Sequence, residues 1–270
     1  MKSKGIAIPY VVWMAIFVVA PLILVVVYAF TDRSGSFTTE NFSSMFQYAT
    51  VFGRSFLLAF IATVICILLG YPMAYFLARE RGRLRSMATM LIMLPMWMNF
   101  LLRTYSWVFL LERNGFFNTL LETIGLPKLD IIDTQGAVVL GMVYNFLPFM
   151  VLPIFSVIEK LDHRLIEAAQ DLGANSTQVF RRVIFPLSLP GVLSGVTMVF
   201  IPSVSTFVIS RLLGGSKSLL LGDLIEMQFL GNAYNPHLGS AIALVMMVIV
   251  LVCMAIMNRF GEGEEGVAVL

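Results

Sequence analysis

Long apolar runs separated by short polar segments make up most of this 270-residue chain. A helix that crosses a bilayer needs roughly 20 consecutive apolar residues. Hydrocarbon cannot satisfy exposed backbone N–H and C=O groups, so each crossing segment must be helical. The pattern therefore predicts an all-α membrane protein with one transmembrane domain over residues 1–270. Its six transmembrane helices are expected at about 8–30, 55–78, 87–110, 136–158, 187–210 and 238–259.

Two of the segments between these runs are predicted to hold short helices outside the membrane. The segment 112–133 contains NTLLETIGLP, an amphipathic helix that should end at Gly125 and Pro127. The segment 211–237 contains SLLLGDLIEMQFLG. Its length and mixed polarity favour a surface helix over a seventh span.

The polar loop at 159–186, between the fourth and fifth runs, predicts a hairpin of two short helices. In the first, Ile158, Leu161, Leu165, Ala168, Ala169 and Leu172 form an apolar stripe at three- and four-residue spacing. Gly173 supplies the left-handed position that ends it. Asn175 and Gln178 have the spacing of a capping box that opens a second helix at 176–184. Pro186 and Pro190 are expected to mark the turn into the fifth span.

Composition and charge place the loop on the cytoplasmic side. The chain is 59% hydrophobic and 13% charged, against about 25% charged residues in soluble domains. Placing both termini inside puts 11 of the 18 basic residues on the cytoplasmic side, with the densest cluster, RERGRLR, at 79–85. The net charge of +2 is too small to indicate nucleic-acid binding. Lys2 and Lys4 resemble a signal-peptide start, but the following run is too long, which favours an uncleaved span.

The first helix of the loop has the character of a docking element. Small Ala168, Ala169 and Gly173 allow close backbone approach, and Glu167 and Asp171 lie one turn apart on the polar side. A helix that merely rests on lipid favours Lys and Arg on its polar face. The acidic face therefore favours a soluble protein partner.

These residues resemble the cytoplasmic signature of bacterial type I ABC importer permeases: Glu-Ala-Ala, three residues, Gly, nine residues, then Ile-x-Leu-Pro. The chain has Glu167, Ala168, Ala169 and Gly173, and it departs from the pattern only by apolar exchanges in 183–186. More narrowly, it resembles the B-type permease subunits of spermidine/putrescine importers over most of the chain, most strongly at 144–174 and 214–230. That resemblance implies a bacterial inner-membrane location, a second permease, two ATPase subunits docked at the loop and an external binding protein.

The chain also lacks what an independent transporter or enzyme would need. No G-x-x-x-x-G-K-[ST] motif occurs, so ATP and Mg²⁺ are expected on the partner ATPase, with no cofactor and no metal in this chain. No predicted span carries a carboxylate, which disfavours an ion-coupled secondary carrier. No span carries a His/Asp/Glu cluster, which disfavours a membrane enzyme. The same architecture serving sulfate, molybdate or iron stays open as the nearer alternative.

A polyamine path should offer aromatic faces, neutral acceptors and carboxylates, because aromatic rings attract ammonium groups by about 0.5–2 kcal/mol. Arg103 lies inside the third run, where snorkelling or an ion pair with Asp133 is expected to satisfy its charge. Ser203 follows a proline that should bend the fifth span, and Asp223 is a candidate at the outer mouth. The path candidates are Trp97, Asn99, Tyr105, Tyr144, Asn145, Ser203 and Asp223.

Overall fold

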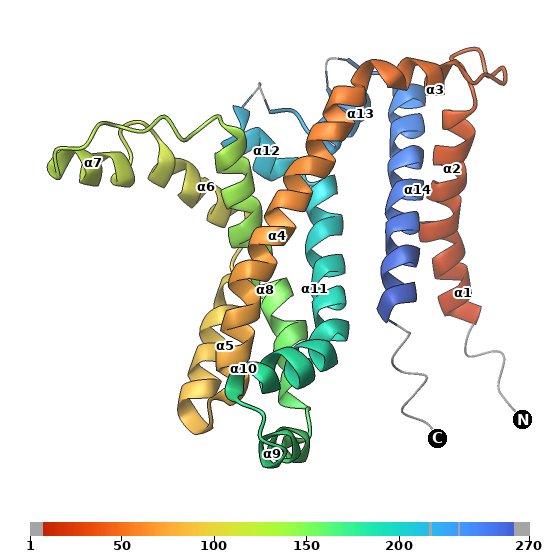
Figure 1. Cartoon of the computed structure of the whole chain (residues 1–270). Helices are drawn as coiled ribbons and strands as arrows, with labels where there is room; N and C mark the ends of the chain where they lie inside the picture. The colour runs from red at the N-terminus through yellow and green to blue at the C-terminus, as the bar shows by residue number, and fades with distance from the viewer. Residues whose placement is uncertain (1–7, 216–217, 232, 262–270) are drawn as a thin grey trace, which may run out of the picture.

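Three long helices form the centre of the molecule (Figure 1). The computed structural model describes residues 8–215, 218–231 and 233–261. Helices α4 (Ala49–Arg79), α8 (Gln135–Glu159) and α11 (Phe185–Ser205) pack side by side. The buried side chain of Met150 lies between Gly70 and Gly195, where added Cβ atoms would come within 2.9 Å and 2.7 Å of it. Glycine at both positions therefore lets α4 and α11 approach α8 closely.

The first and last helices form a separate arm (Figure 1). Helices α1 (Ile8–Met14) and α2 (Ala20–Ala29), joined by a π-helical stretch, run beside α14 (Pro236–Gly261). His237 Nδ1 lies 3.1 Å from the backbone oxygen of Tyr28, and the two rings meet edge to face at 5.1 Å. The first span covers Pro9–Ala29. In its most apolar 18-residue window, no residue is buried within the chain. The arm thus leaves a long apolar surface to be covered from outside.

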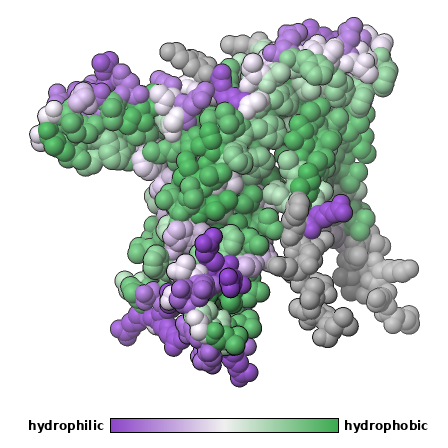
Figure 2. Space-filling view, viewed as in Figure 1, coloured by the Kyte–Doolittle hydropathy of each residue, from purple (hydrophilic) through white to green (hydrophobic). Residues whose placement is uncertain are grey.

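Five helices of the described chain are long and apolar enough to cross a membrane, and the bent pair Gly82–Trp97 and Phe100–Thr123 makes a sixth if it is counted as one span. The four predicted at 8–30, 55–78, 136–158 and 238–259 coincide with helices or helix pairs of the structure. An apolar band covers the middle of the molecule, with polar residues gathered at its two ends (Figure 2). The all-α membrane fold expected from the sequence is confirmed.

The third predicted span is not one straight helix, which corrects the boundary 87–110. Helix α5 (Gly82–Trp97) stops, and α6 (Phe100–Leu111) starts in a new direction. The bend between Gly82–Trp97 and Phe100–Thr123 is 94°. Pro95 cannot donate a backbone hydrogen bond near the end of α5. Asn99 then caps α6, because its Oδ1 accepts from the N–H groups of Leu101 at 2.9 Å and Leu102 at 3.4 Å.

The fifth predicted span, 187–210, also needs correction at both ends. The chain is continuously helical from α10 (Ser176–Val179) through a π-helical turn (Phe180–Ile184) into α11, so Pro186 and Pro190 do not end a helix. At its other end α11 stops at Ser205. Thr206 is extended, and a short helix, α12 (Val208–Leu213), follows.

The remaining short helices lie at the two ends of the bundle. Helix α7 (Phe116–Thr123) ends before Gly125 as predicted, and Gly125 has a φ of +80°. Helix α13 (Leu221–Leu230) is too short for a seventh span, as expected, but it is buried among other helices and is not a surface helix. The others are α3 (Glu40–Met45), beside the arm, and α9 (His163–Asp171), at the opposite end of the molecule.

Candidate functional site

The α9–α10 hairpin is held in shape by local hydrogen bonds that the sequence predicts. Asp162 caps α9 by accepting from the N–H of Arg164 at 3.0 Å. Gly173 adopts a φ of +83° and donates to the carbonyl of Gln170 at 2.8 Å, which ends the helix. Asn175 and Gln178 exchange two bonds of 2.9 Å in the expected capping box. The hairpin is therefore a rigid element whose shape does not depend on a partner.

One face of α9 packs on the rest of the chain, and another is open. Leu161, Ile166 and Ala169 contact the core formed by α4 and α8. Leu165 and Ala168 are exposed, and Leu172 is 90% exposed. The predicted apolar stripe is therefore wrong as a single packed surface, since it divides between an inner and an outer face. We call Leu165, Glu167, Ala168, Asp171 and Leu172 the docking face.

The residues predicted to couple the chain to an ATPase lie on or beside this docking face. Glu167, Ala168, Asp171 and Gly173 are exposed, whereas Ala169 is half-buried against the core. The face thus presents an apolar centre flanked by two carboxylates. Such an uncovered surface is typical of a protein–protein contact.

The hairpin connects to the long helices through aromatic side chains. The ring of Phe180 lies edge-on to Tyr71 at 5.8 Å and to Tyr75 at 5.3 Å, both on α4. The Tyr71 hydroxyl and Ser188 Oγ are 2.8 Å apart and buried. A displacement of the hairpin would therefore be passed on to α4 and α11 through packed side chains.

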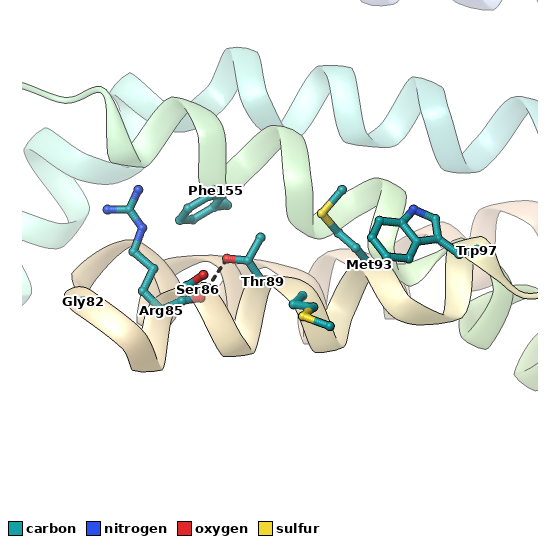
Figure 3. Close-up of a pocket in the computed structure, with 8 residues that line it drawn as sticks. Gly82, Arg85, Ser86, Thr89, Met93, Trp97 and Phe155 are labelled. Atoms are coloured by element: carbon teal, nitrogen blue, oxygen red, sulfur yellow. Dashed lines mark hydrogen bonds between the residues drawn. The ribbon is translucent and has the colours of Figure 1, made fainter.

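Two hollows lie at the hairpin end of the molecule. The first, which we call the Trp97 groove, has a volume of about 470 Å³ and runs along α5 beside Phe155 of α8 (Figure 3). The second, the hairpin cavity, has a volume of about 530 Å³ and lies between the ends of α4 and α8 and the hairpin. Its polar and charged lining consists of Tyr75, Arg79, Glu80, Arg81, Arg85, Glu159, His163, Gln170 and Ser176.

Only some of the predicted path residues are accessible. Trp97 is 74% exposed at the end of α5 and lines its groove. Asn99 is exposed, but its carbonyl oxygen is engaged in capping α6. Tyr105 is exposed on α6. Tyr144 lies edge-on to Trp107 at 5.2 Å, and both line an apolar hollow of about 720 Å³ between α4 and α8.

Asn145 and Ser203 are buried inside the bundle. Asn145 Nδ2 donates to the carbonyl of Gly141 at 2.9 Å, and its Oδ1 has no hydrogen-bond partner among the described residues. Ser203 Oγ donates to the carbonyl of Val199 at 2.7 Å. In this conformation neither side chain reaches a groove.

Asp223 is 2% exposed, so the structure places it in the protein and not at an open mouth. One of its oxygens accepts from Ser210 Oγ at 2.5 Å and from the N–H of Leu220 at 3.0 Å. Burial raises the pKa of its carboxyl group despite these two bonds. The neighbouring Glu226 is paired with Arg211 at 3.0 Å. Asp223 thus joins α12 to α13.

Arg103 also differs from expectation. It is buried on α6 and forms no ion pair with Asp133. Its Nε and Nη1 atoms have no hydrogen-bond partner in the described part of the chain. Helix α6 packs against α8 and α12, which gives the Arg103 side chain a protein environment.

Comparison with known proteins gives this geometry a context. Residues 67–262 match the family model described as binding-protein-dependent transport system inner membrane component. The chain is 40% identical to the spermidine/putrescine transport system permease protein PotB of Haemophilus influenzae, over 92% of this chain and 90% of that protein. It is 37% identical to PotB of Escherichia coli strain K12, over 88% and 90%.

Solved structures agree on the fold. A crystal structure of a bacterial ABC transporter involved in import of the acidic polysaccharide alginate superposes with a TM-score of 0.78 and 19% identity, covering 96% of this chain and 94% of that one. The inward-facing MetNI methionine ABC transporter gives a TM-score of 0.62 at 16% identity, covering 82% and 97%.

Proposed function

Because the chain belongs to the family of binding-protein-dependent transport system inner membrane components, we propose that it is a permease subunit of an ATP-driven importer of polyamines. Transport, and not catalysis, is the activity of this family. The substrate class rests on the identity of 37–40% to spermidine/putrescine permeases over about nine-tenths of the chain. The observation that carries the coupling role is the open docking face of α9 on a rigid hairpin.

The docking face would seat this subunit on an ATPase that supplies the energy. An apolar centre at Ala168 and Leu172 provides contact area, and the carboxylates of Glu167 and Asp171 provide complementary charge for a basic rim. The small side chain of Ala168 permits close approach by the partner. Nucleotide-driven movement of the ATPase would then reach α4 and α11 through Phe180, Tyr71 and Ser188.

A second permease would complete the path. The Trp97 groove is open along one side, so a path enclosed on all sides needs another wall. The apolar arm of α1 and α2 likewise needs a cover of lipid or protein. We assign the missing wall to a related permease, with two ATPase subunits below the pair and an external binding protein above it.

The orientation follows from the docking function. The described ends of α1 and α14 lie at the same end of the molecule as α9 (Figure 1). If α9 meets a cytoplasmic ATPase, both termini are cytoplasmic. The charge distribution supports the same orientation, since the basic cluster at 79–85 also lies at the hairpin end.

Within the path, Trp97 offers an aromatic face to an ammonium group, and Thr89 offers a hydroxyl group farther along the same groove. Each cation–π contact contributes about 0.5–2 kcal/mol, weak enough for a substrate to move on. Asn99, Tyr105 and Tyr144 would contact the substrate beyond Trp97, on the side away from the hairpin. Asn145, Ser203 and Asp223 would reach substrate only after the bundle rearranges.

The test is ATP hydrolysis by the reconstituted complex of this chain with its genome-neighbour permease, ATPase and binding protein. Stimulation by spermidine or putrescine is expected. An assembled complex that responds to sulfate, molybdate or iron and not to polyamines would contradict the substrate and keep the architecture. A chain that transports without any ATPase would contradict the coupling role.

A further inference from the structure

The two hollows at the hairpin end share a lining residue. Arg85 is the one residue, among those that the structure describes, that lines both the Trp97 groove and the hairpin cavity. The groove extends from Trp97 to Gly82 along α5, and Arg85 lies at its hairpin end (Figure 3). A solute moving along α5 from the groove into the hairpin cavity would therefore meet the Arg85 side chain.

Two groups on α8 hold the Arg85 side chain where the two hollows meet. Its guanidinium lies over the ring of Phe155 with a distance of 5.3 Å to the centroid, and it pairs with the carboxylate of Glu159. Phe155 and Glu159 are one turn apart on α8, so their side chains lie on the same face. Together they form a cation site that consists of an aromatic face beside a carboxylate. The Arg85 guanidinium occupies this site.

The same chemistry suits an alkylammonium group. Aromatic faces and carboxylates attract an ammonium as they attract a guanidinium. Both side chains of the ion pair are about one-third exposed, at 34% and 35%, so water and a solute can reach them. Exchange of one cation for another leaves Glu159 paired throughout, whereas simple separation would leave both charges without a partner.

We propose that Arg85, Phe155 and Glu159 form an exit gate for polycations, in which an ammonium group of the substrate replaces the Arg85 guanidinium on Phe155 and Glu159. This inference rests on the proposed polyamine import function and adds a specificity-determining site to it. A neutral or anionic solute cannot make the exchange, so the closed ion pair blocks it. The gate thus selects positive charge at the last step before the hairpin cavity.

The experiment measures import of spermidine and putrescine by proteoliposomes that contain the complete complex. Glu159→Gln should lower the maximal rate about tenfold, the loss expected for one charge-assisted bond. The substrate concentration for half-maximal import should stay unchanged, because external capture is untouched. The loss should be larger for trivalent spermidine than for divalent putrescine. A purely structural ion pair would affect both substrates equally.

Two variants separate a gate from a structural ion pair. Arg85→Gln should lower import less than Glu159→Gln does, because Phe155 and Glu159 stay available to the substrate. The double exchange Arg85→Glu with Glu159→Arg rebuilds an ion pair but moves the carboxylate away from Phe155, and import should stay low. Glu80→Gln is the matched control, since Glu80 lines the hairpin cavity without lining the groove.

Equal losses in Arg85→Gln and Glu159→Gln, or rescue by the double exchange, would overturn the gate. If Glu159→Gln does not assemble, Phe155→Leu decides, and an unchanged spermidine rate in that variant would refute the proposal. If the unmodified complex imports no polyamine while hydrolysing ATP, the proposed function fails instead. The two failures are therefore distinguishable.

Discussion

Helices α9 and α13 are both short, and both lie between long apolar helices with acidic residues among leucines. In α9 the carboxylates of Glu167 and Asp171 are exposed, and Leu172 is uncovered. In α13 Asp223 is buried and bonded to Ser210, and Leu224 is 5% exposed. The acidic side of α13 is thus covered within this chain, whereas the acidic side of α9 is left open.

A close approach of backbones explains why α13 is buried. Gly222 lies so near the carbonyl oxygens of Ser205 and Thr206 that an added Cβ would come within 2.4 Å and 2.7 Å of them. The N–H of Leu221 also donates to Ser55 Oγ of α4 at 2.8 Å. Helix α9 has instead Gly173, around which an added Cβ meets nothing within 4 Å.

Reversing a charge on the docking face should have the largest effect. Glu167→Lys is expected to abolish ATP-driven uptake and leave membrane insertion unchanged, since like charges brought together at an interface cost several kcal/mol. Uptake and membrane content are measured in the same cells. Glu40→Lys, an exposed charge reversal at the other end of the molecule, is the control and should transport normally. Wild-type uptake by Glu167→Lys would show that the acidic side of α9 is not needed for coupling to the ATPase.

Leucine truncation compares the two helices directly. Leu224→Ala should lower the free energy of unfolding by roughly 2–5 kcal/mol, because it leaves a cavity in a packed site. Leu172→Ala should change stability by less than about 0.5 kcal/mol, because the side chain is solvent-exposed in the isolated subunit. Thermal unfolding of the two purified variants measures both. Equal destabilisation would mean that Leu172 is covered within the chain.

The buried carboxylate of α13 gives a pH-dependent prediction. Because the pKa of Asp223 is raised above its ordinary value of 3.8, ionisation costs free energy in the folded state. Stability relative to Asp223→Asn should therefore be greatest below that ordinary value and fall as the pH rises through the raised pKa. At neutral pH Asp223→Asn should be the more stable protein, while Asp223→Ala loses about 1–3 kcal/mol with its hydrogen bonds.

The pH series is followed by unfolding of the three proteins in detergent. An Asp223→Asn variant that is less stable than the unmodified chain at neutral pH would show that the charged form is favoured in the fold.

A path residue should produce the smallest change. Trp97→Ala is expected to reduce uptake by roughly 2- to 30-fold, the loss that corresponds to one cation–π contact, without changing association with the ATPase. Trp13→Ala, which removes another exposed ring on the arm, serves as the control and should leave uptake unaltered. Normal uptake by Trp97→Ala would mean that the Trp97 ring serves in packing and does not contact the substrate.

Much of the architecture was predictable, because helix length and the capping chemistry of Asn175 and Gln178 are local properties. The break before α6 was missed, although Pro95 followed by the helix-capping Asn99 was the signal for it. Burial of Asp223 could not be inferred, since it depends on contacts with Ser210 that are formed only after folding. For the same reason, periodicity could not decide which of the two apolar strips of α9 packs inward.

The docking face is tested most directly by cross-linking. Cysteine would be placed at Ala168 in a chain whose Cys66 and Cys253 are replaced by alanine, and the assembled complex would be treated with a short thiol cross-linker. We expect a product between this chain and the ATPase, and none from a cysteine at Phe37. That residue is exposed in the loop between α2 and α3, and α3 lies at the end opposite α9 (Figure 1). A complex whose ATP hydrolysis is stimulated by substrate but which never cross-links through position 168 would show that the docking face does not meet the ATPase.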